Sequence, residues 1–352
     1  MRVGVVYHPR FGKGCEKFVF VADALRAEGH DVTHCQTNAE VEAADERCDV
    51  MLFEQRNPAS ICLADFIRRC QKPHNGYWIQ WQFDLAVFDD SLPIEKQPGI
   101  EPYIDVMRGM DLVLVKERDR LDEYFAAGVK AKWFDQACPS SMAQAVLKAD
   151  PELDVILWGS AARPLWGQRW RDAETLVKAG FKVAWATTDG NLPDGIYRLP
   201  GCQPLELPSL IERAKVVLCV DARQDIPGYW SDRIWLAAGA GACIVRRFGS
   251  VDGHGGGNLP AMGYGSDAML ISAVRELCDS FDKRIRYGDF ARRMTFANNL
   301  YEHRVRELMN YAHGQTHKGH ENPDVPSVFR QEDYRPEDAR WESQEDAVPV
   351  LH

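Results

Sequence analysis

The 352-residue chain lacks the sequence signatures of several common protein classes. Its ten cysteines include no C-x-x-C pair, which argues against a structural zinc site. No apolar run approaches the ~20 residues of a membrane span, and the opening MRVGVVYHP has the pattern of a buried strand, not of a signal peptide. We therefore expect a cytoplasmic protein with reduced cysteines, most of them in apolar segments such as those around Cys219 and Cys243.

Two phosphate-binding motifs are also missing. The Gly-rich segment HPRFGKG at residues 8–14 contains no GK[ST], so it is not a Walker A motif. It is not a G-x-G-x-x-G fingerprint either. A nicotinamide-dependent oxidoreductase therefore lacks its usual sequence support, although an α/β fold alone would allow one.

The charge of the chain is unevenly distributed. A net charge of −10 disfavours non-specific binding to nucleic acid or to anionic membranes. The polar segment 313–352 is rich in acids, and we expect it to form an extended tail. The region before it is locally basic and could meet a polyanion. Its basic residues are Lys283, Arg284, Arg286, Arg292, Arg293, Arg304 and Arg306.

The hydrophobic pattern predicts two successive α/β domains, in agreement with the length of the chain. Within 1–150, strands are expected over 2–8, 32–36, 49–54, 77–83, 111–116 and 131–135, with helices over 18–29, 59–70 and 118–127. After a linker with a helical piece at 139–151, the alternation restarts. Strands are then expected over 154–159, 181–187, 216–221 and 242–245, with helices over 168–179, 206–214 and 232–239. This rhythm predicts two doubly wound parallel sheets, in domains 1–150 and 151–287.

The segment YWSDRIWLAAGAGACIV at 229–245 is the most informative stretch of the chain. Ser231 is a suitable N-cap for a helix, and Asp232 adds an acidic group to its first turn. Arg233 then lies beside the positive end of that helix, where an anion is favoured. The small residues at 237–241 allow close packing on a sheet or a ligand.

This segment resembles the second-domain signature of nucleotide-sugar glycosyltransferases with the GT-B fold. It is most similar to the spore-maturation (CgeB-like) branch and its bacteriophage relatives, in which Tyr-x-Ser-Asp/Asn-Arg precedes a Gly-rich helix end. The runs LPGCQPLELPSLIERAKVVL and FARRMTFANNLYEHRVRELM are similar to other elements of these proteins. The resemblance implies two Rossmann-like domains facing a central cleft, the first for the acceptor and the second for the donor. It also implies a closing helix, at 288–312, that returns to the first domain.

A donor site is expected at the carboxyl ends of the second domain's strands. A nucleotide diphosphate needs close backbone N–H groups and one or two cations. For Gly159 and Arg233 the alternatives are a tight turn and an ordinary ion pair. The resemblance further implies that backbone near Gln203 and Leu205 meets the nucleobase. The expected donor-binding residues are Gly159, Ser160, Arg163, Arg169, Gln203, Leu205, Asp221, Tyr229, Ser231, Asp232 and Arg233.

In the first domain we expect Asp84 to be the catalytic general base, with His8 as a second catalytic candidate. Asp84 ends the aromatic strand YWIQWQFD, and such a strand is suited to form the wall of an acceptor site. A helix cap or a loop acid is the alternative for Asp84, and a loop histidine for His8. Glu54 and Glu117 also follow strands and are weaker candidates.

Three functions remain open on this reading. The first is sugar transfer from a nucleotide sugar to a hydroxymethylated base in DNA, as the bacteriophage relatives perform; the second is transfer to a spore or surface glycan. The third is a non-catalytic nucleotide-binding protein, because many relatives carry a glutamate where Trp235 or Leu236 stands here. No D-x-D triplet lies near a strand end, so we expect no essential metal and no cofactor beyond the nucleotide sugar. Trp230 is a candidate to stack on donor or acceptor.

Overall fold

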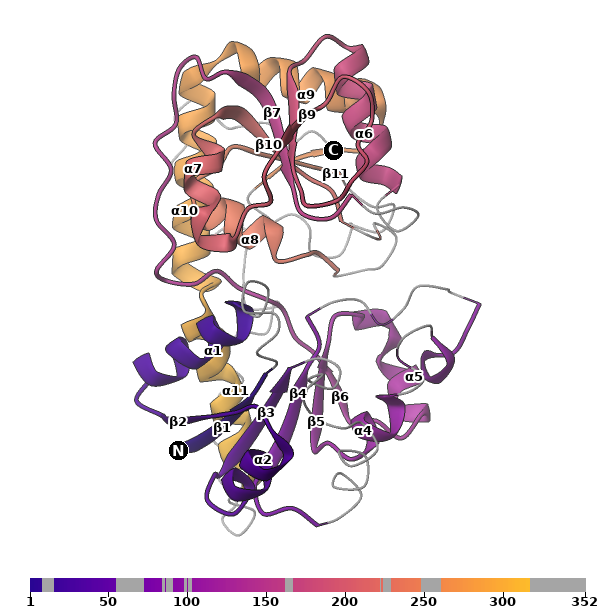
Figure 1. Ribbon diagram of the computed structural model, residues 1–352, viewed down its shortest axis with the longest axis vertical. Coiled ribbons are helices and arrows are strands. Elements are labelled where there is room, and N and C mark those ends of the chain that lie inside the picture. Colours follow the sequence, from indigo (N-terminus) through magenta and orange to yellow (C-terminus); the bar gives the residue numbers. More distant parts are fainter. Residues whose placement is uncertain are drawn as a thin grey trace, which may run out of the picture.

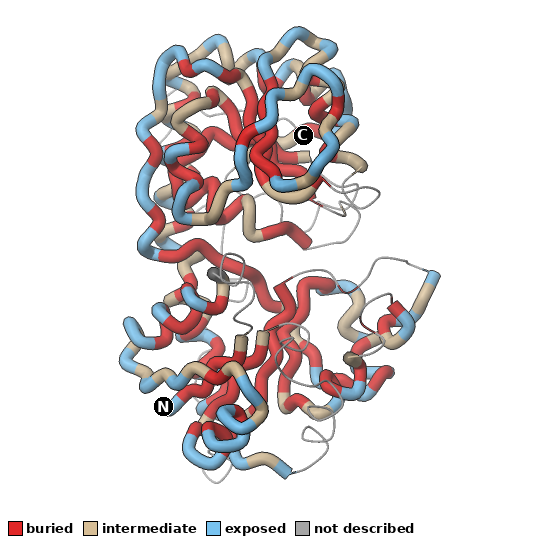
Figure 2. The backbone as a smooth tube through the Cα atoms, in the orientation of Figure 1, coloured by how far each residue is buried: buried red, intermediate tan, exposed pale blue. Residues whose placement is uncertain are grey.

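The described part of the computed structural model forms two α/β domains, one above the other in Figure 1. It comprises residues 1–7, 16–54, 73–83, 86, 91–97, 100, 103–161, 167–221, 223, 229–247 and 261–316. Each domain is built on a six-stranded sheet whose strands are all parallel. In each domain the buried residues follow the strands and the helix faces turned toward them (Figure 2). The expectation of two doubly wound α/β domains is confirmed.

The first sheet has the strand order β2-β1-β3-β4-β5-β6. Its strands are β1 (Arg2–Val6), β2 (Asp31–Cys35), β3 (Val50–Glu54), β4 (Tyr77–Trp81), β5 (Leu112–Val115) and β6 (Ala131–Trp133). Its helical segments are α1 (Glu16–Ala27), α2 (Asn38–Asp45), η2 (Ile94–Lys96), α4 (Ile104–Arg108), η4 (Arg118–Arg120) and α5 (Leu121–Ala126). The strand order reverses direction between β1 and β3, as in flavodoxin-like sheets. The inner strands β1, β3, β4 and β5 are largely buried because helices cover both faces of such a sheet, whereas the edge strand β2 buries only Cys35.

The second sheet has the order β12-β11-β10-β7-β8-β9. Its strands are β7 (Leu153–Trp158), β8 (Val183–Ala186), β9 (Tyr197–Leu199), β10 (Ala214–Cys219), β11 (Ile244–Arg247) and β12 (Met262–Tyr264). Its helical segments are α6 (Gly167–Lys178), η5 (Pro204–Glu206), α7 (Leu207–Ile211), α8 (Arg233–Gly239) and α9 (Asp267–Asp279). This is the Rossmann order, and its direction reverses between β7 and β10. Ligands of such sheets bind beyond the carboxyl ends of the strands at that reversal.

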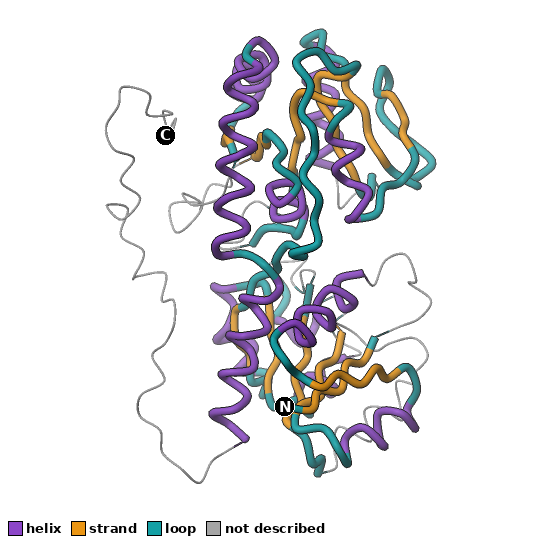
Figure 3. The backbone as a smooth tube through the Cα atoms, turned by 90° about the vertical axis from the view of Figure 1, so that its left-hand side faces the viewer, coloured by secondary structure: helices purple, strands orange, loops and turns teal. Residues whose placement is uncertain are grey.

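The predicted single helix over 288–312 is wrong, because the structure divides it into two. Helix α10 (Phe281–Asn298) lies on the second domain and α11 (Tyr301–Thr316) on the first. Between them the chain pairs with the interdomain segment: the Cys138 N–H donates to the Asn299 carbonyl (2.9 Å) and the Tyr301 N–H to the Cys138 carbonyl (3.0 Å). These bonds take the backbone out of the helical pattern. Figure 3 shows the two helices as one column along one side of both domains.

Helix α11 belongs to the core of the first domain. Tyr301, Val305 and Leu308 are buried in the same apolar cluster as residues of β1, α1 and β4. On the outer side, Arg306 donates to both carboxylate oxygens of Glu28, which follows α1. The last part of the chain in the described residues therefore stabilises the domain in which the chain begins.

The remaining differences from the sequence expectation concern short elements. Strands β9 and β12 and helices α2 and α4 are absent from the prediction, and 139–151 contains no helix although a helical piece is expected there. The backbone of this segment is hydrogen bonded to the second domain. The Ala145 N–H donates to the Ala240 carbonyl, and Arg284 donates to the Ala149 carbonyl. The predicted helix at 59–70 and most of the polar tail lie outside the described residues.

Candidate active site

The reversal point of the second sheet lies at the ends of β7 and β10. Gly159 and Ser160 follow β7, and Asp221 lies just beyond β10. Arg169, from α6, is 1% exposed and connects the two strand ends. Its Nε donates to the Val220 carbonyl (2.7 Å) and its Nη1 to the Ser160 carbonyl (2.9 Å). Arg169 therefore holds the two strand ends together from a buried position and places a positive charge next to the site.

Arg233 lies over Gly159, at the start of α8. Its Nε donates to the Trp158 carbonyl (3.2 Å), and a β-carbon added to Gly159 would lie 2.6 Å from its Nη2. Gly159 has φ of +92°, a backbone conformation that glycine adopts without strain. The Ser160 hydroxyl donates to Asp189 (2.9 Å). The sequence prediction thus placed Gly159, Ser160 and Arg233 in one site, and the structure brings these residues together.

Asp221 is the centre of a buried polar network at the same strand ends. It is 5% exposed and accepts from the Ser231 N–H (2.9 Å) and from Nε of Arg246 (3.4 Å), a buried residue of β11. The pKa of Arg169 is lowered, first by burial and then by the positive charge of Arg233. Arg246 pairs with this buried carboxylate, and Arg169 lies within electrostatic reach of both Asp221 and Arg233, so the positive charge gathered at these strand ends suits an anionic ligand.

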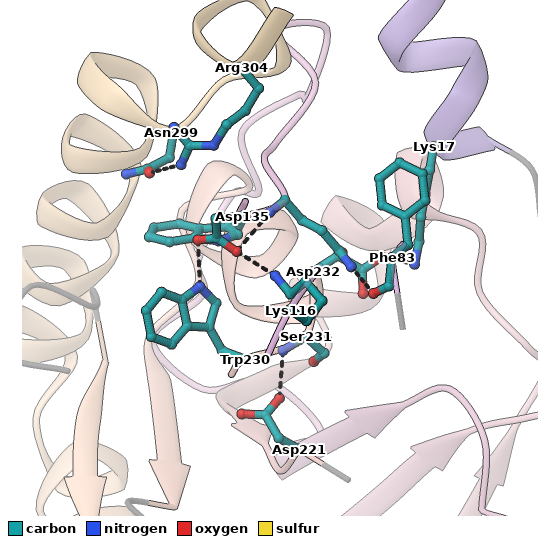
Figure 4. A network of polar contacts seen from close by, with 12 residues as sticks. Lys17, Phe83, Lys116, Asp135, Asp221, Trp230, Ser231, Asp232, Asn299 and Arg304 are labelled. Atoms are coloured by element: carbon teal, nitrogen blue, oxygen red, sulfur yellow. Dashed lines mark hydrogen bonds and ion pairs between the residues drawn. The ribbon is translucent and has the colours of Figure 1, made fainter. Parts of the chain in front are cut away.

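The expected N-cap at Ser231 is wrong. Helix α8 begins at Arg233, and Asp232 is the residue that precedes its first turn. The Ser231 N–H donates to Asp221, and the helix begins only after the next residue, Asp232. The Asp232 carboxylate instead points toward the first domain and pairs with Lys17 of α1 (3.2 Å, Figure 4). The Lys17 ammonium also lies over the ring of Phe83, 5.4 Å from its centroid.

The pKa of Asp232 is below its ordinary value. Burial alone would raise this pKa, but the positive charges of Lys17, Arg233 and Lys116 together outweigh the cost of burial. Asp232 is the acidic residue nearest to the position where the resemblance implies a glutamate. Because its carboxylate is ionised and paired with the first domain, Asp232 joins the two domains at the site.

A second buried carboxylate joins the domains close by. Asp135 follows β6, and its Oδ1 accepts from the Lys116 ammonium (2.6 Å). Its Oδ2 accepts from the indole N–H groups of Trp230 (2.6 Å) and Trp235 (3.0 Å), on either side of Arg233. Figure 4 shows the Trp230 indole turned toward Asp135. Trp230 is buried, with its ring 6.2 Å from that of Trp133, so its interactions are with the protein core and the linker.

Sequence reasoning did not single out Lys17, Lys116 or Asp135. Lys116 and Asp135 are the last residues of the strands expected over 111–116 and 131–135, and this position at a strand end was the signal available. Of the other expected donor residues, Tyr229 is buried in the apolar cluster of the first domain. The Gln203 N–H donates to Glu206 (2.9 Å), and Leu205 is exposed. Arg163 and the two catalytic candidates, His8 and Asp84, lie outside the described residues.

The weaker acidic candidates occupy different environments. Glu117, after β5, is fully buried and accepts from the Tyr124 hydroxyl (3.1 Å) and from the Ala86 N–H. Glu54 ends β3 and is partly exposed. After Glu117 in the chain, the guanidinium of the exposed Arg118 lies over the ring of the partly exposed Trp133, 5.7 Å from its centroid. A cation and an aromatic ring thus lie together at the strand ends of the first domain.

Most of the basic residues at 283–306 are held by contacts within the fold. Arg284 is buried and donates to the Leu277 and Ala149 carbonyls, and Arg292 donates to the Met142 carbonyl. Arg304 donates to Asn299 (2.7 Å). Because the fold uses most of these residues, they give less support to a polyanion-binding surface.

Among the described residues, no group of three or more His, Cys, Asp or Glu side chains could hold a metal ion. None of the described helices is long and apolar enough to cross a membrane. Buried thiols such as Cys219 and Cys243 are free, and burial raises the pKa of the Cys219 thiol to about 12.

Comparison with known proteins identifies the fold. Residues 140–310 match the family model described as "Glycosyl transferase-like", and no curated protein sequence matches the chain. An α-glucosyltransferase solved with UDP and a 13-mer DNA containing an HMU base has a TM-score of 0.63 and 11% identity, over 89% of this chain and 99% of that one. The T4 phage β-glucosyltransferase has a TM-score of 0.60 and 12% identity over 89% and 99%. Sucrose-phosphate synthase from Thermosynechococcus elongatus has a TM-score of 0.59 and 11% identity over 90% and 99%.

The fold is therefore that of GT-B glycosyltransferases, and the expected resemblance is confirmed at that level. The family match lies in the second domain and α10–α11. It includes the strand ends where Gly159, Arg169, Asp221, Arg233 and Arg246 lie, which we call the arginine site. Together the family match and the fold support a transferase of the glycosyltransferase class.

Proposed function

We propose that this chain is a glycosyltransferase that uses a nucleotide sugar and binds the donor diphosphate at the reversal point of its second sheet. The observation that carries the proposal is the guanidinium of Arg233 over Gly159, beside the buried pair of Arg246 and Asp221. In sugar transfer, negative charge grows on the departing diphosphate as its bond to the sugar C1 breaks. Fixed cations at that place stabilise the transition state more than the ground state.

The acceptor side of the reaction belongs to the first domain in this proposal. The acceptor oxygen attacks C1 of the sugar while the bond from C1 to the nucleoside diphosphate breaks. In an inverting reaction Asp84 takes the acceptor proton, and His8 is the second candidate in this role. The acceptor meets the edge of the first sheet where Arg118 lies over Trp133.

We further propose a hydroxymethylated base in DNA as the acceptor. A structure of the same fold is an α-glucosyltransferase in complex with UDP and DNA containing an HMU base, which supports this choice. A cation stacked on an aromatic ring at the acceptor edge suits a nucleic acid, whose phosphates and bases use such groups. A spore or surface glycan is the second candidate acceptor, because aromatic rings also bind sugars.

The test is a product analysis. The full chain is incubated with a mixture of nucleotide sugars and one of two matched duplexes, with or without hydroxymethylated pyrimidines. We expect mass spectrometry to find a sugar added only to the hydroxymethylated duplex. Release of nucleoside diphosphate without any modified DNA would contradict DNA as the acceptor and favour another one, such as a glycan. Binding of nucleotide without any turnover would favour the non-catalytic alternative.

A further inference from the structure

The two domains are connected by two chain segments that are hydrogen bonded to each other. One crosses at 134–139 and the other at 299–300, and they share the paired bonds between Cys138 and the Asn299–Tyr301 backbone. Arg304 of α11 donates to the Asn299 side chain (2.7 Å) and fixes the second crossing (Figure 4). Any movement of one domain against the other turns about these few residues.

Asp135 lies in the first of these crossings and accepts from both domains. Lys116, of the first domain, is fully buried, and Asp135 is 5% exposed. The two indole donors, Trp230 and Trp235, belong to the second domain, and the Gln136 N–H adds a bond at Oδ1 (2.7 Å). Both carboxylate oxygens are therefore occupied, one by a cation and a backbone N–H and the other by two indole N–H groups.

These indoles flank the residues that carry the arginine site. Trp230 immediately precedes Ser231, and Trp235 lies in the first turn of α8 after Arg233. The other end of α8 also meets the crossing: a β-carbon at Gly239 would lie 2.1 Å from the Cys138 Sγ. The short helix that presents Arg233 is thus held against the interdomain crossing at both its ends.

We propose that Asp135 is a positioning residue for the donor site, which sets the orientation of the 230–235 segment and ties it to the first domain through Lys116. The proposal rests on the proposed function. An asparagine at this position has the same shape but only one acceptor oxygen. Its NH2 group would face either the Lys116 ammonium or the two indole N–H groups, so one side of the junction would lose its partner.

The test compares Asp135→Asn with Asp154→Asn in the full-length protein. Asp154 is a matched control: its carboxylate also accepts from one lysine, Lys215 (2.9 Å), and one backbone N–H, that of Lys182 (2.9 Å). It lies at the amino end of the second sheet, away from the site. The dissociation constants of UDP, GDP, ADP and dTDP are measured by calorimetry, with the melting temperature and the donor KM and kcat of each variant.

Asp135→Asn is expected to weaken the preferred nucleoside diphosphate by about tenfold or more and to raise the donor KM by a similar factor. Asp154→Asn is expected to lower the melting temperature and leave that affinity within about twofold. Trp235→Phe, which removes one of the indole donors, should weaken binding in the same direction by a smaller factor.

Unchanged affinity in a folded Asp135→Asn protein overturns the proposal. If that variant does not fold, unchanged affinity in Trp235→Phe overturns it instead. Equal losses in Asp135→Asn and Asp154→Asn would show a general effect of stability and overturn it as well. Failure of the wild-type protein to bind any of the four nucleotides removes the proposed function first, and this inference falls with it.

Discussion

The guanidinium of Arg233 occupies the space that a side chain at Gly159 would need. A β-carbon built on Gly159 lies 2.6 Å from Nη2 and 2.9 Å from Nε of Arg233. The backbone of Gly159 also has φ of +92°. The turn after β7 therefore packs directly against the start of α8. The position of Arg233 depends on the absence of a side chain at Gly159.

Substitution of Gly159 by alanine is expected to reduce both stability and donor affinity. The positive φ costs about 1–2 kcal/mol of unfolding free energy for a residue with a β-carbon. The new methyl group would also displace Arg233. Gly180→Ala is the matched control, because Gly180 has φ of +91° and its β-carbon would meet no described atom within 4 Å.

Thermal unfolding should show a loss of stability in both glycine variants, larger in Gly159→Ala because Arg233 is displaced, and calorimetry should show weaker nucleotide binding only in Gly159→Ala. Equal affinity in the two variants would mean that the position of Arg233 does not matter for the donor.

Arg233→Ala should weaken binding of the nucleoside diphosphate by about ten- to a hundredfold, since one charge-assisted hydrogen bond contributes roughly 1.5–3 kcal/mol. Arg213→Ala serves as the control, because Arg213 pairs with Glu152 on the surface of the same domain. Calorimetry at fixed ionic strength measures both. A donor affinity in Arg233→Ala equal to that of the control would remove Arg233 from the binding site.

The Lys17–Asp232 pair should give the protein a pH-dependent stability. The pKa of Asp232 is lower in the folded state than the ~3.9 of an unfolded aspartate. A lowered folded pKa means that the stabilisation is complete above the unfolded pKa and disappears as the pH falls through the folded value.

The melting temperature of the wild type should therefore exceed that of Asp232→Asn by a constant amount from pH 7 to about 5. The difference should shrink below about pH 4. In a Lys17→Met background the same comparison should give a smaller difference, because the partner is absent. A difference that grows as the pH falls would contradict the assigned direction of the pKa shift.

Asp84→Asn is expected to reduce turnover by about 10²–10⁴-fold, the usual contribution of a general base, and to leave nucleotide affinity unchanged. Asp111→Asn is a control at the amino end of β5, where the Asp111 carboxylate accepts from the Trp78 N–H (2.9 Å). Steady-state rates with the modified duplex measure both variants. Near-normal turnover in Asp84→Asn would show that Asp84 is only a loop acid or that the reaction retains configuration.

The fold was predictable because its central strands are mostly apolar. Segments such as the one from Leu153 to Trp158 are buried on both faces, and their sequence shows this without knowledge of their neighbours. Strand β9 has two exposed residues out of three, and β12 has three residues next to a Gly-rich segment. Neither carries enough pattern to be recognised alone.

The site was predictable only within one domain. Gly159, Ser160 and Arg233 could be grouped because strand ends of one parallel sheet lie together. The contacts of Asp232 with Lys17 and of Asp135 with Trp230 depend on how two domains are placed. Local sequence does not encode that placement. The misplaced N-cap depends on a contact within the second domain, because Asp221, which lies beyond β10, accepts from the Ser231 N–H.

The central claim is that the arginine site activates a nucleotide sugar for transfer, and nucleoside diphosphate release measures this most directly. The wild-type protein, Arg233→Ala and Arg213→Ala are each incubated with a panel of nucleotide sugars and the hydroxymethylated duplex. We expect release from at least one nucleotide sugar by the wild type and by Arg213→Ala, and a rate at least tenfold lower for Arg233→Ala. Release at the same rate by Arg233→Ala, or no release from any nucleotide sugar by the wild type, would contradict it.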